Sequence, residues 1–138
     1  MGDIPAKGSM VSTIITNPKP GDVLNENETF QLTANIKNLV AGTFTNPDVT
    51  YYSTPQQLQG GLVVGHMHFT VQDLGDNLAP TNAPDASTFV FFKGVNDDGD
   101  GNGNLAATVE GGLPAGNYRV CTMSSSSNHQ LVVMPVAQ

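Results

Sequence analysis

The chain has 138 residues, of which 12% are charged, and a formal net charge of −7. This length suits a single domain with a real core. Five scattered basic residues exclude the basic patch that nucleic acids and anionic membrane surfaces require. No apolar run is long enough for membrane insertion.

The first nine residues are small and polar, and we expect residues 1–9 to form a flexible arm ahead of one domain at 10–138. A strand is predicted at 10–15, and proline and glycine then predict a turn at 17–22. The clearest strand is 30–37, where apolar and polar residues alternate as in a half-buried antiparallel strand.

The later part of the chain continues this pattern of short strands separated by turns. The run at 88–95 is almost continuously apolar, so we expect a strand that is covered on both faces or that lies at a sheet junction. A serine-rich turn is predicted at 124–128, and a last strand is predicted to begin at His129. Strands are predicted at 62–72, 88–95, 105–109, 119–123 and 129–137.

No segment has apolar residues at helical spacing over ten or more positions. About seven short strands with frequent turn signals predict an all-β fold, an immunoglobulin-like antiparallel β-sandwich. Leu113, Gly116 and Tyr118, just before a strand, resemble the tyrosine corner of immunoglobulin-like domains. There the phenol hydroxyl would bond to nearby backbone.

The histidines are the most informative candidates for a functional site. His66 and His68 are two residues apart in a predicted strand and therefore share one face, while Met67 and Phe69 face the core. If the strand beginning at His129 lies in the same sheet, the three imidazoles could hold Zn²⁺ or copper and leave a fourth position for water.

An alternative reads His66 and His68 as a solvent-facing or hydrogen-bonded pair on a polar sheet face, beside Thr70 and Gln72. In favour of this alternative, neither predicted histidine strand supplies a carboxylate or another partner that would orient an imidazole.

A second candidate site is the loop with oxygen-bearing residues at alternate positions. Asp98, Asp100 and Asn102 match the first ligand positions of a Ca²⁺ loop. Position twelve would be Val109, where a bidentate carboxylate is expected, so Ca²⁺ is a weaker prediction than copper or zinc. The alternative is a flexible hairpin loop.

Two further features concern recognition at the surface. Tyr51 and Tyr52, near several amide side chains, predict a carbohydrate-binding platform, or else a long connection with one packed tyrosine. Asn27 begins the only N-glycosylation sequon. No nucleophile elbow, phosphate loop or dinucleotide fingerprint is present, which favours a non-enzymatic protein.

Six segments, spread over most of the chain, form a recognisable set of motifs. They are Gly42-Thr43-Phe44-Thr45-Asn46-Pro47, Tyr51-Tyr52, Gly65-His66-Met67-His68-Phe69-Thr70, Phe91-Phe92-Lys93-Gly94-Val95-Asn96, Gly112-Leu113-Pro114-Ala115-Gly116-Asn117-Tyr118-Arg119 and Asn128-His129-Gln130. Together these motifs resemble a family of small secreted fungal proteins of unknown function, often mislabelled as ribosomal proteins. The resemblance implies a fungal source, secretion and a further strand beyond Gln138, which could carry a disulfide partner for Cys121.

We therefore expect an extracellular or cell-surface protein with a structural or adhesive role. Its partner would be a protein or glycan of the cell wall or matrix, or a second copy of itself. The competing hypothesis is a copper or zinc protein that uses His66, His68 and His129 in redox or hydrolytic chemistry.

Overall fold

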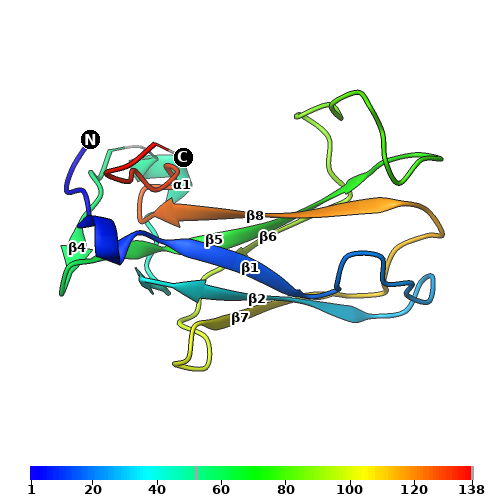
Figure 1. Ribbon diagram of the computed structural model, residues 1–138, viewed down its shortest axis with the longest axis horizontal. Coiled ribbons are helices and arrows are strands. Elements are labelled where there is room, and N and C mark those ends of the chain that lie inside the picture. The colour runs from blue at the N-terminus through cyan, green and yellow to red at the C-terminus, as the bar shows by residue number, and fades with distance from the viewer. Residues whose placement is uncertain (52, 138) are drawn as a thin grey trace.

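The computed structural model describes residues 1–51 and 53–137, and it consists mainly of two facing β-sheets (Figure 1). One sheet has the order β1-β2-β7 and is antiparallel throughout. Its strands are β1 (Ser12–Asn17), β2 (Phe30–Lys37) and β7 (Asn104–Val109). The predicted all-β sandwich is confirmed, and its immunoglobulin-like character stays a prediction.

The second sheet is organised around one long strand, β5 (Leu62–Asp73). Antiparallel neighbours flank it, β8 (Tyr118–Ser126) on one side and β6 (Phe91–Val95) on the other. At its start, β5 also pairs with β3 (Leu39–Val40) in parallel and with β4 (Leu58–Gln59) antiparallel. The four other strands of this sheet therefore all pair with β5.

Within residues 1–51 and 53–137, helical structure is limited to a 3-10 turn, η1 (Lys7–Ser9), and one short helix, α1 (Pro47–Thr50). The Asn46 side chain caps α1 by accepting the Asp48 N–H at 2.9 Å, and Pro47 suits the first helical position. Among the residues described, no helix is long and apolar enough to cross a membrane.

The N-terminal segment lies beside the segment 130–137 at one end of the sandwich (Figure 1). Buried Gln56 connects the two, because its side-chain amide donates to the carbonyl oxygens of Asp3 and Val133. Pro5 is also fully buried. Part of the segment predicted as a flexible arm is thus held against the domain.

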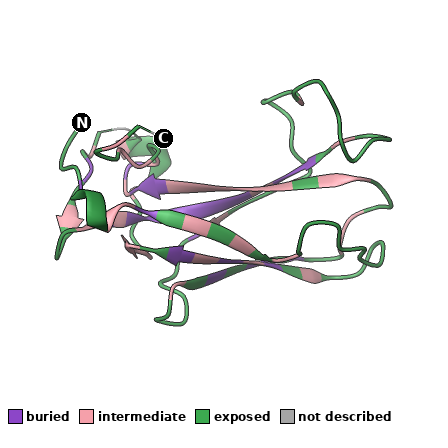
Figure 2. Ribbon diagram, viewed as in Figure 1, coloured by how far each residue is buried: buried purple, intermediate pink, exposed green. Residues whose placement is uncertain are grey.

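The core lies between the sheets and is formed by alternate residues of β2, β5 and β7 (Figure 2). The alternation is strict in β7, where every second residue is buried. Met67 and Phe69, which were predicted to face the core, are fully buried, and Phe30 and Val120 pack against the core while partly exposed. The buried apolar residues of the core are Val11, Leu32, Ala34, Ile36, Val63, Met67, Phe69, Val71, Val95, Leu105, Ala107 and Val109.

The predicted last strand at 129–137 is wrong. β8 continues through the serines to Ser126, because they pair with β5, and the close approach at Gly65 leaves no room for a side chain there. A Cβ on Gly65 would lie 1.9 Å from the Ser125 carbonyl oxygen. The chain then turns. Beyond the turn, Leu131 forms an isolated antiparallel bridge with Ser125 of β8, in place of a strand.

The predicted strand at 88–95 is also wrong in its start and its burial. β6 begins at Phe91, and Phe89, Val90 and Phe92 are 58%, 45% and 48% exposed. Only Phe91 packs against the core and Val95 belongs to it. The continuous apolar run therefore reflects an exposed aromatic cluster, not a strand covered on both faces.

The tyrosine-corner resemblance is supported by one hydrogen bond. The Tyr118 hydroxyl donates to the Pro114 carbonyl oxygen at 2.7 Å. A Cβ on Gly116 would lie 3.1 Å from that hydroxyl, so glycine lets the ring lie against the connection.

Replacing Phe69 by alanine should lower the free energy of unfolding by about 3–5 kcal/mol, because Phe69 is fully buried between the sheets and truncation leaves a cavity. Urea denaturation measures the change. Phe89→Ala, at a largely exposed ring, is the matched control and should cost less than about 1 kcal/mol. Equal losses at the two positions would show that the faces of β5 are assigned backwards.

Candidate metal centre

The outer face of β5 carries the two histidines, and it is covered by the rest of the chain. His66 is 0% exposed and His68 is 5% exposed, so the solvent-facing form of the alternative is wrong. Its hydrogen-bonded form agrees with the structure, because both rings have hydrogen-bond partners. The 43–45 segment is hydrogen-bonded beside the histidines. The Thr43 N–H donates to the Gly65 carbonyl of β5, and the Thr45 N–H donates to the Ser127 carbonyl that follows β8. β5 is therefore a strand buried on both sides, with apolar side chains on one face and imidazoles on the other.

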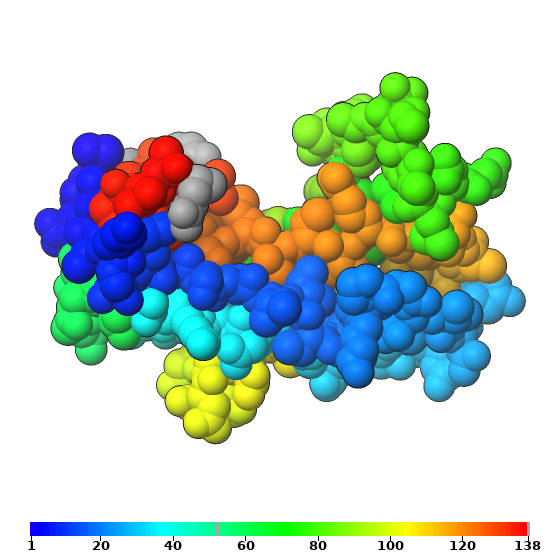
Figure 3. Space-filling model, viewed as in Figure 1, coloured from blue at the N-terminus to red at the C-terminus, as the bar shows by residue number. Residues whose placement is uncertain are grey.

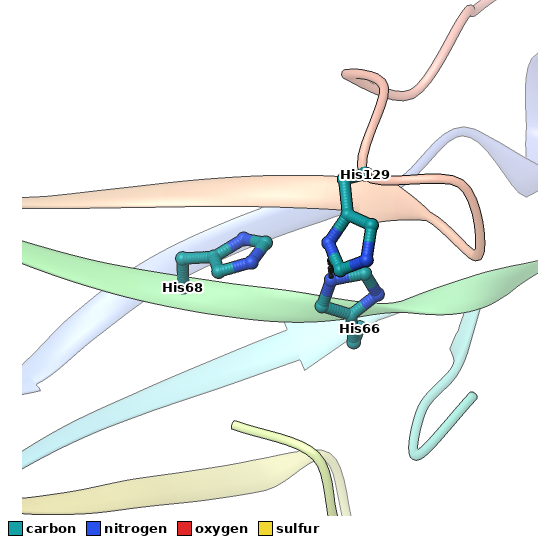
Figure 4. Close-up of side chains that lie close together, drawn as sticks. All are labelled: His66, His68 and His129. Carbon is teal, nitrogen blue, oxygen red and sulfur yellow. Dashed lines mark hydrogen bonds between the residues drawn. The ribbon is translucent and has the colours of Figure 1, made fainter. Parts of the chain in front are cut away.

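His129 reaches this face from a turn, not from a strand. Its backbone has φ of 67°, and its N–H donates to the Ser126 carbonyl at 3.0 Å. A positive φ is uncommon for a residue other than glycine. This turn folds the ring back over β5, where one ring nitrogen each of His66, His68 and His129 lies within 4.8 Å of the others (Figure 4).

Backbone carbonyls fix the orientation of two of the rings. His66 Nδ1 lies 3.2 Å from the Thr43 carbonyl oxygen, and His129 Nε2 lies 2.7 Å from the Thr45 carbonyl oxygen. A carbonyl only accepts, so each of these nitrogens must carry the proton. In the neutral rings, His66 Nε2 and His129 Nδ1 then bear the lone pairs.

Those two lone-pair nitrogens face each other at 3.1 Å. Neither atom has a proton to donate while both rings are neutral and both carbonyl bonds are kept. Two facing acceptors repel, and a cation placed between them removes the repulsion. This is the arrangement that metal-ligating histidines adopt when their other ring nitrogen donates to a carbonyl.

The groups that orient His66 and His129 come from outside the predicted histidine strands, because they are carbonyls of the 43–45 segment. His68 is placed differently. Its Nδ1 lies 3.4 Å from the Ser125 hydroxyl, which can donate or accept. The position opposite His68 on β6 is Gly94, and a Cβ there would lie 3.3 Å from the imidazole.

Each histidine also contacts one partly exposed aromatic ring. Phe92 stacks on His68 with centroids 5.3 Å apart, and Tyr51 stacks on His129 at 5.4 Å. Phe44 meets His66 edge-on at 6.0 Å. These rings cover the cluster with apolar surface and lower the local dielectric.

Burial disfavours the charged forms of His66 and His68. It lowers the pKa of His66 to about 4, and positive charge on His68 or His129 would lower it further, against the raising effect of the Thr43 hydrogen bond. Burial also lowers the pKa of His68, with His129 as the next cause. His66 is thus free of a competing proton at pH 7.

The spacing is close to that of a metal site. Three nitrogens bound at 2.0–2.1 Å in tetrahedral geometry lie about 3.3 Å from one another. The His66–His129 pair, at 3.1 Å, is close to this value, and the candidate ligand nitrogens of all three histidines lie within 4.8 Å of one another.

The Asp98–Asn102 loop projects from the body of the sandwich (Figure 3, yellow). The Asp100 carboxylate accepts hydrogen bonds from the backbone and side chain of Asn104 and from the Asn102 N–H, which lower its pKa. Asp98 and Asn102 are exposed. Residues 1–51 and 53–137 contain no other group of three His, Cys, Asp or Glu close enough to hold an ion. The Ca²⁺ loop stays a prediction.

The remaining sequence predictions fall outside the cluster or at its margin. Tyr51 belongs to the aromatic cover, and Tyr52 lies outside the described residues. Asn27 is exposed in a turn with φ of 55°, and its glycosylation stays a prediction. Cys121 is a partly exposed free thiol on β8.

Sequence reasoning missed the groups that complete the site, namely the Thr43 and Thr45 carbonyls, the Ser125 hydroxyl, and the rings of Phe44 and Phe92. The amino-acid sequence does not identify which backbone carbonyl points toward an imidazole. The aromatic residues could have been found only as unusually exposed ones near a histidine strand.

Comparison with known proteins identifies the family. The family model described as the CLU5d N-terminal domain matches residues 13–138. The Pathogenicity cluster 5 protein d of the fungus Colletotrichum graminicola is 60% identical over 139 residues, which is 100% of this chain and 29% of the relative. No solved structure matches the chain. The chain therefore belongs to the CLU5d N-terminal domain family, and it spans less than a third of this curated relative.

The metal-free protein should lose stability as the pH falls from about 6.5 to about 4. Over that range His66 is protonated in the unfolded chain but not in the folded protein, because its pKa is lower in the folded state. Protonation therefore stabilises the unfolded chain. The loss for His66 is on the order of 3 kcal/mol and levels off below pH 4. Denaturant unfolding at several pH values, in a chelator, measures it.

Carboxylates also titrate near pH 4, so the wild-type profile must be compared with that of His66→Gln, which should decline less steeply. Parallel profiles for the two proteins would contradict the assignment of this loss to His66.

Proposed function

We propose that this member of the CLU5d N-terminal domain family binds one copper or zinc ion through His66, His68 and His129. The observation that carries the proposal is the pair of lone-pair nitrogens, His66 Nε2 and His129 Nδ1, held face to face at 3.1 Å by backbone carbonyls. A metal ion between them, joined by His68, satisfies both.

The ligand set suits these metals for reasons of charge and geometry. Three neutral imidazoles leave a fourth position for water or another ligand, as in open zinc and copper sites. The 43–45 segment would orient two ligands, and the aromatic rings would limit access of water. A bound ion would also tie this segment and the 127–129 turn to β5.

We further propose that the domain acts outside the fungal cell. The resemblance to small secreted fungal proteins and the low content of charged residues support this. The relative's name refers to pathogenicity, and the domain covers only 29% of that protein. The metal site is thus proposed as one module of a larger protein.

Wild-type protein should bind about one equivalent of Zn²⁺ or Cu²⁺, measured by elemental analysis after dialysis and by calorimetry. His66→Ala combined with His68→Ala should abolish binding, because two of three ligands are lost. Thr70→Ala, on the same face of β5 one step further along, is the control and should bind normally. Absence of stoichiometric metal in folded wild-type protein would refute the proposal.

A second role, as an adhesive module, is favoured by the exposed aromatic cluster. Phe89, Val90 and Phe92 expose much of their side chains, and Phe89 and Phe92 lie 5.7 Å apart. Clustered exposed apolar side chains mark interaction surfaces. We propose that this cluster contacts a glycan or protein of the cell wall.

Phe89→Ser should reduce binding to insoluble cell-wall polysaccharide at least about fivefold in a sedimentation assay, because an exposed aromatic at the centre of a contact carries much of its energy. Ile14→Ser, at a similarly exposed residue of the opposite sheet, should bind as wild type. Undiminished binding by Phe89→Ser would exclude this surface.

A further inference from the structure

The ligand set of the histidine cluster carries no negative charge. Its members are three imidazoles, and among the described residues no aspartate, glutamate or cysteine lies close enough to join them. His66 and His68 are buried, and aromatic rings cover them. An ion entering this site must therefore give up water without gaining an anionic ligand.

The cost of transferring an ion into such a site depends steeply on its charge. Born solvation energy scales with the square of the charge, so a monovalent ion pays about a quarter of the cost of a divalent ion of equal size. Neutral nitrogen ligands in an apolar enclosure thus favour Cu⁺ over Zn²⁺ or Cu²⁺.

The register of β8 adds a sulfur atom to this face. Met123 pairs directly with His68, and residues opposite each other in antiparallel strands project on the same side, about 4.5–5.5 Å apart at Cβ. Met123 is partly exposed and does not belong to the inter-sheet core, whereas Met67 is fully buried in that core. A thioether is a soft ligand that selects Cu⁺.

We propose that the site binds Cu⁺ in preference to Zn²⁺, with the Met123 thioether as fourth ligand beside His66, His68 and His129. This inference rests on the proposed metal-binding function and specifies its ion. Cys121 is the next residue of β8 on the same face, opposite Thr70 and one step further from His66, and it takes no part.

The test measures Cu⁺ affinity under anaerobic, reducing conditions by competition with bicinchoninate, and Zn²⁺ affinity by competition with a chromogenic chelator. Wild-type protein should bind one Cu⁺ more tightly than it binds Zn²⁺. Met123→Leu, which preserves volume, should weaken Cu⁺ binding about tenfold and leave Zn²⁺ affinity within about twofold. Cys121→Ser should match wild type for both ions.

Each other outcome overturns a distinct part of the proposal. Tighter binding of Zn²⁺ than of Cu⁺ overturns the choice of ion but leaves the three-histidine site standing. Equal weakening of both ions by Met123→Leu, or unchanged Cu⁺ affinity, overturns the thioether ligand. Weakened Cu⁺ binding in Cys121→Ser assigns the sulfur to the thiol instead. Failure to bind either ion refutes the proposed function itself.

Discussion

The strand β5 places apolar side chains on one face and imidazoles on the other, and both faces are covered. The apolar face closes the inter-sheet core with β2 and β7. The imidazole face lies under the 43–45 segment, the 127–129 turn and Phe92. Because strand alternation is fixed, a one-residue slip of β5 would exchange the two sets and destroy both environments. The register that builds the core thus also builds the cluster.

Much of the fold follows from period two alone. The alternation in β2 and β7 predicts which residues are buried, since a half-buried strand exposes every second side chain. The prediction of strands and burial fails in two segments, one rich in serine and one rich in aromatic residues. Ser124 to Ser126 suggest a turn, yet they continue β8 because pairing with β5 outweighs their weak strand preference. The aromatic run at 89–92 suggests burial, yet most of it is exposed.

The sequence predicts only part of the site. The spacing of His66 and His68 predicts that they share one face. The approach of His129 is also predicted, but from a last strand that does not form. Its ring arrives instead through a left-handed turn whose position depends on where β8 ends. The two carbonyls that fix the tautomers, those of Thr43 and Thr45, belong to a connection whose side chains do not predict how its backbone is oriented. Backbone orientation in such connections depends on tertiary packing, which local pattern does not encode.

Stability alone does not account for the arrangement at His66 and His129. Burying imidazoles costs solvation, and setting two lone pairs against each other at 3.1 Å adds repulsion that glutamine or an apolar side chain would avoid. Local conflicts of this kind in an otherwise consistent fold concentrate where function requires them. The conflict vanishes when a cation occupies the gap, and the ion's binding energy then adds to folding because the unfolded chain holds no such site. The cost of burying these imidazoles without a cation would thus be the physical counterpart of the proposed affinity for metal.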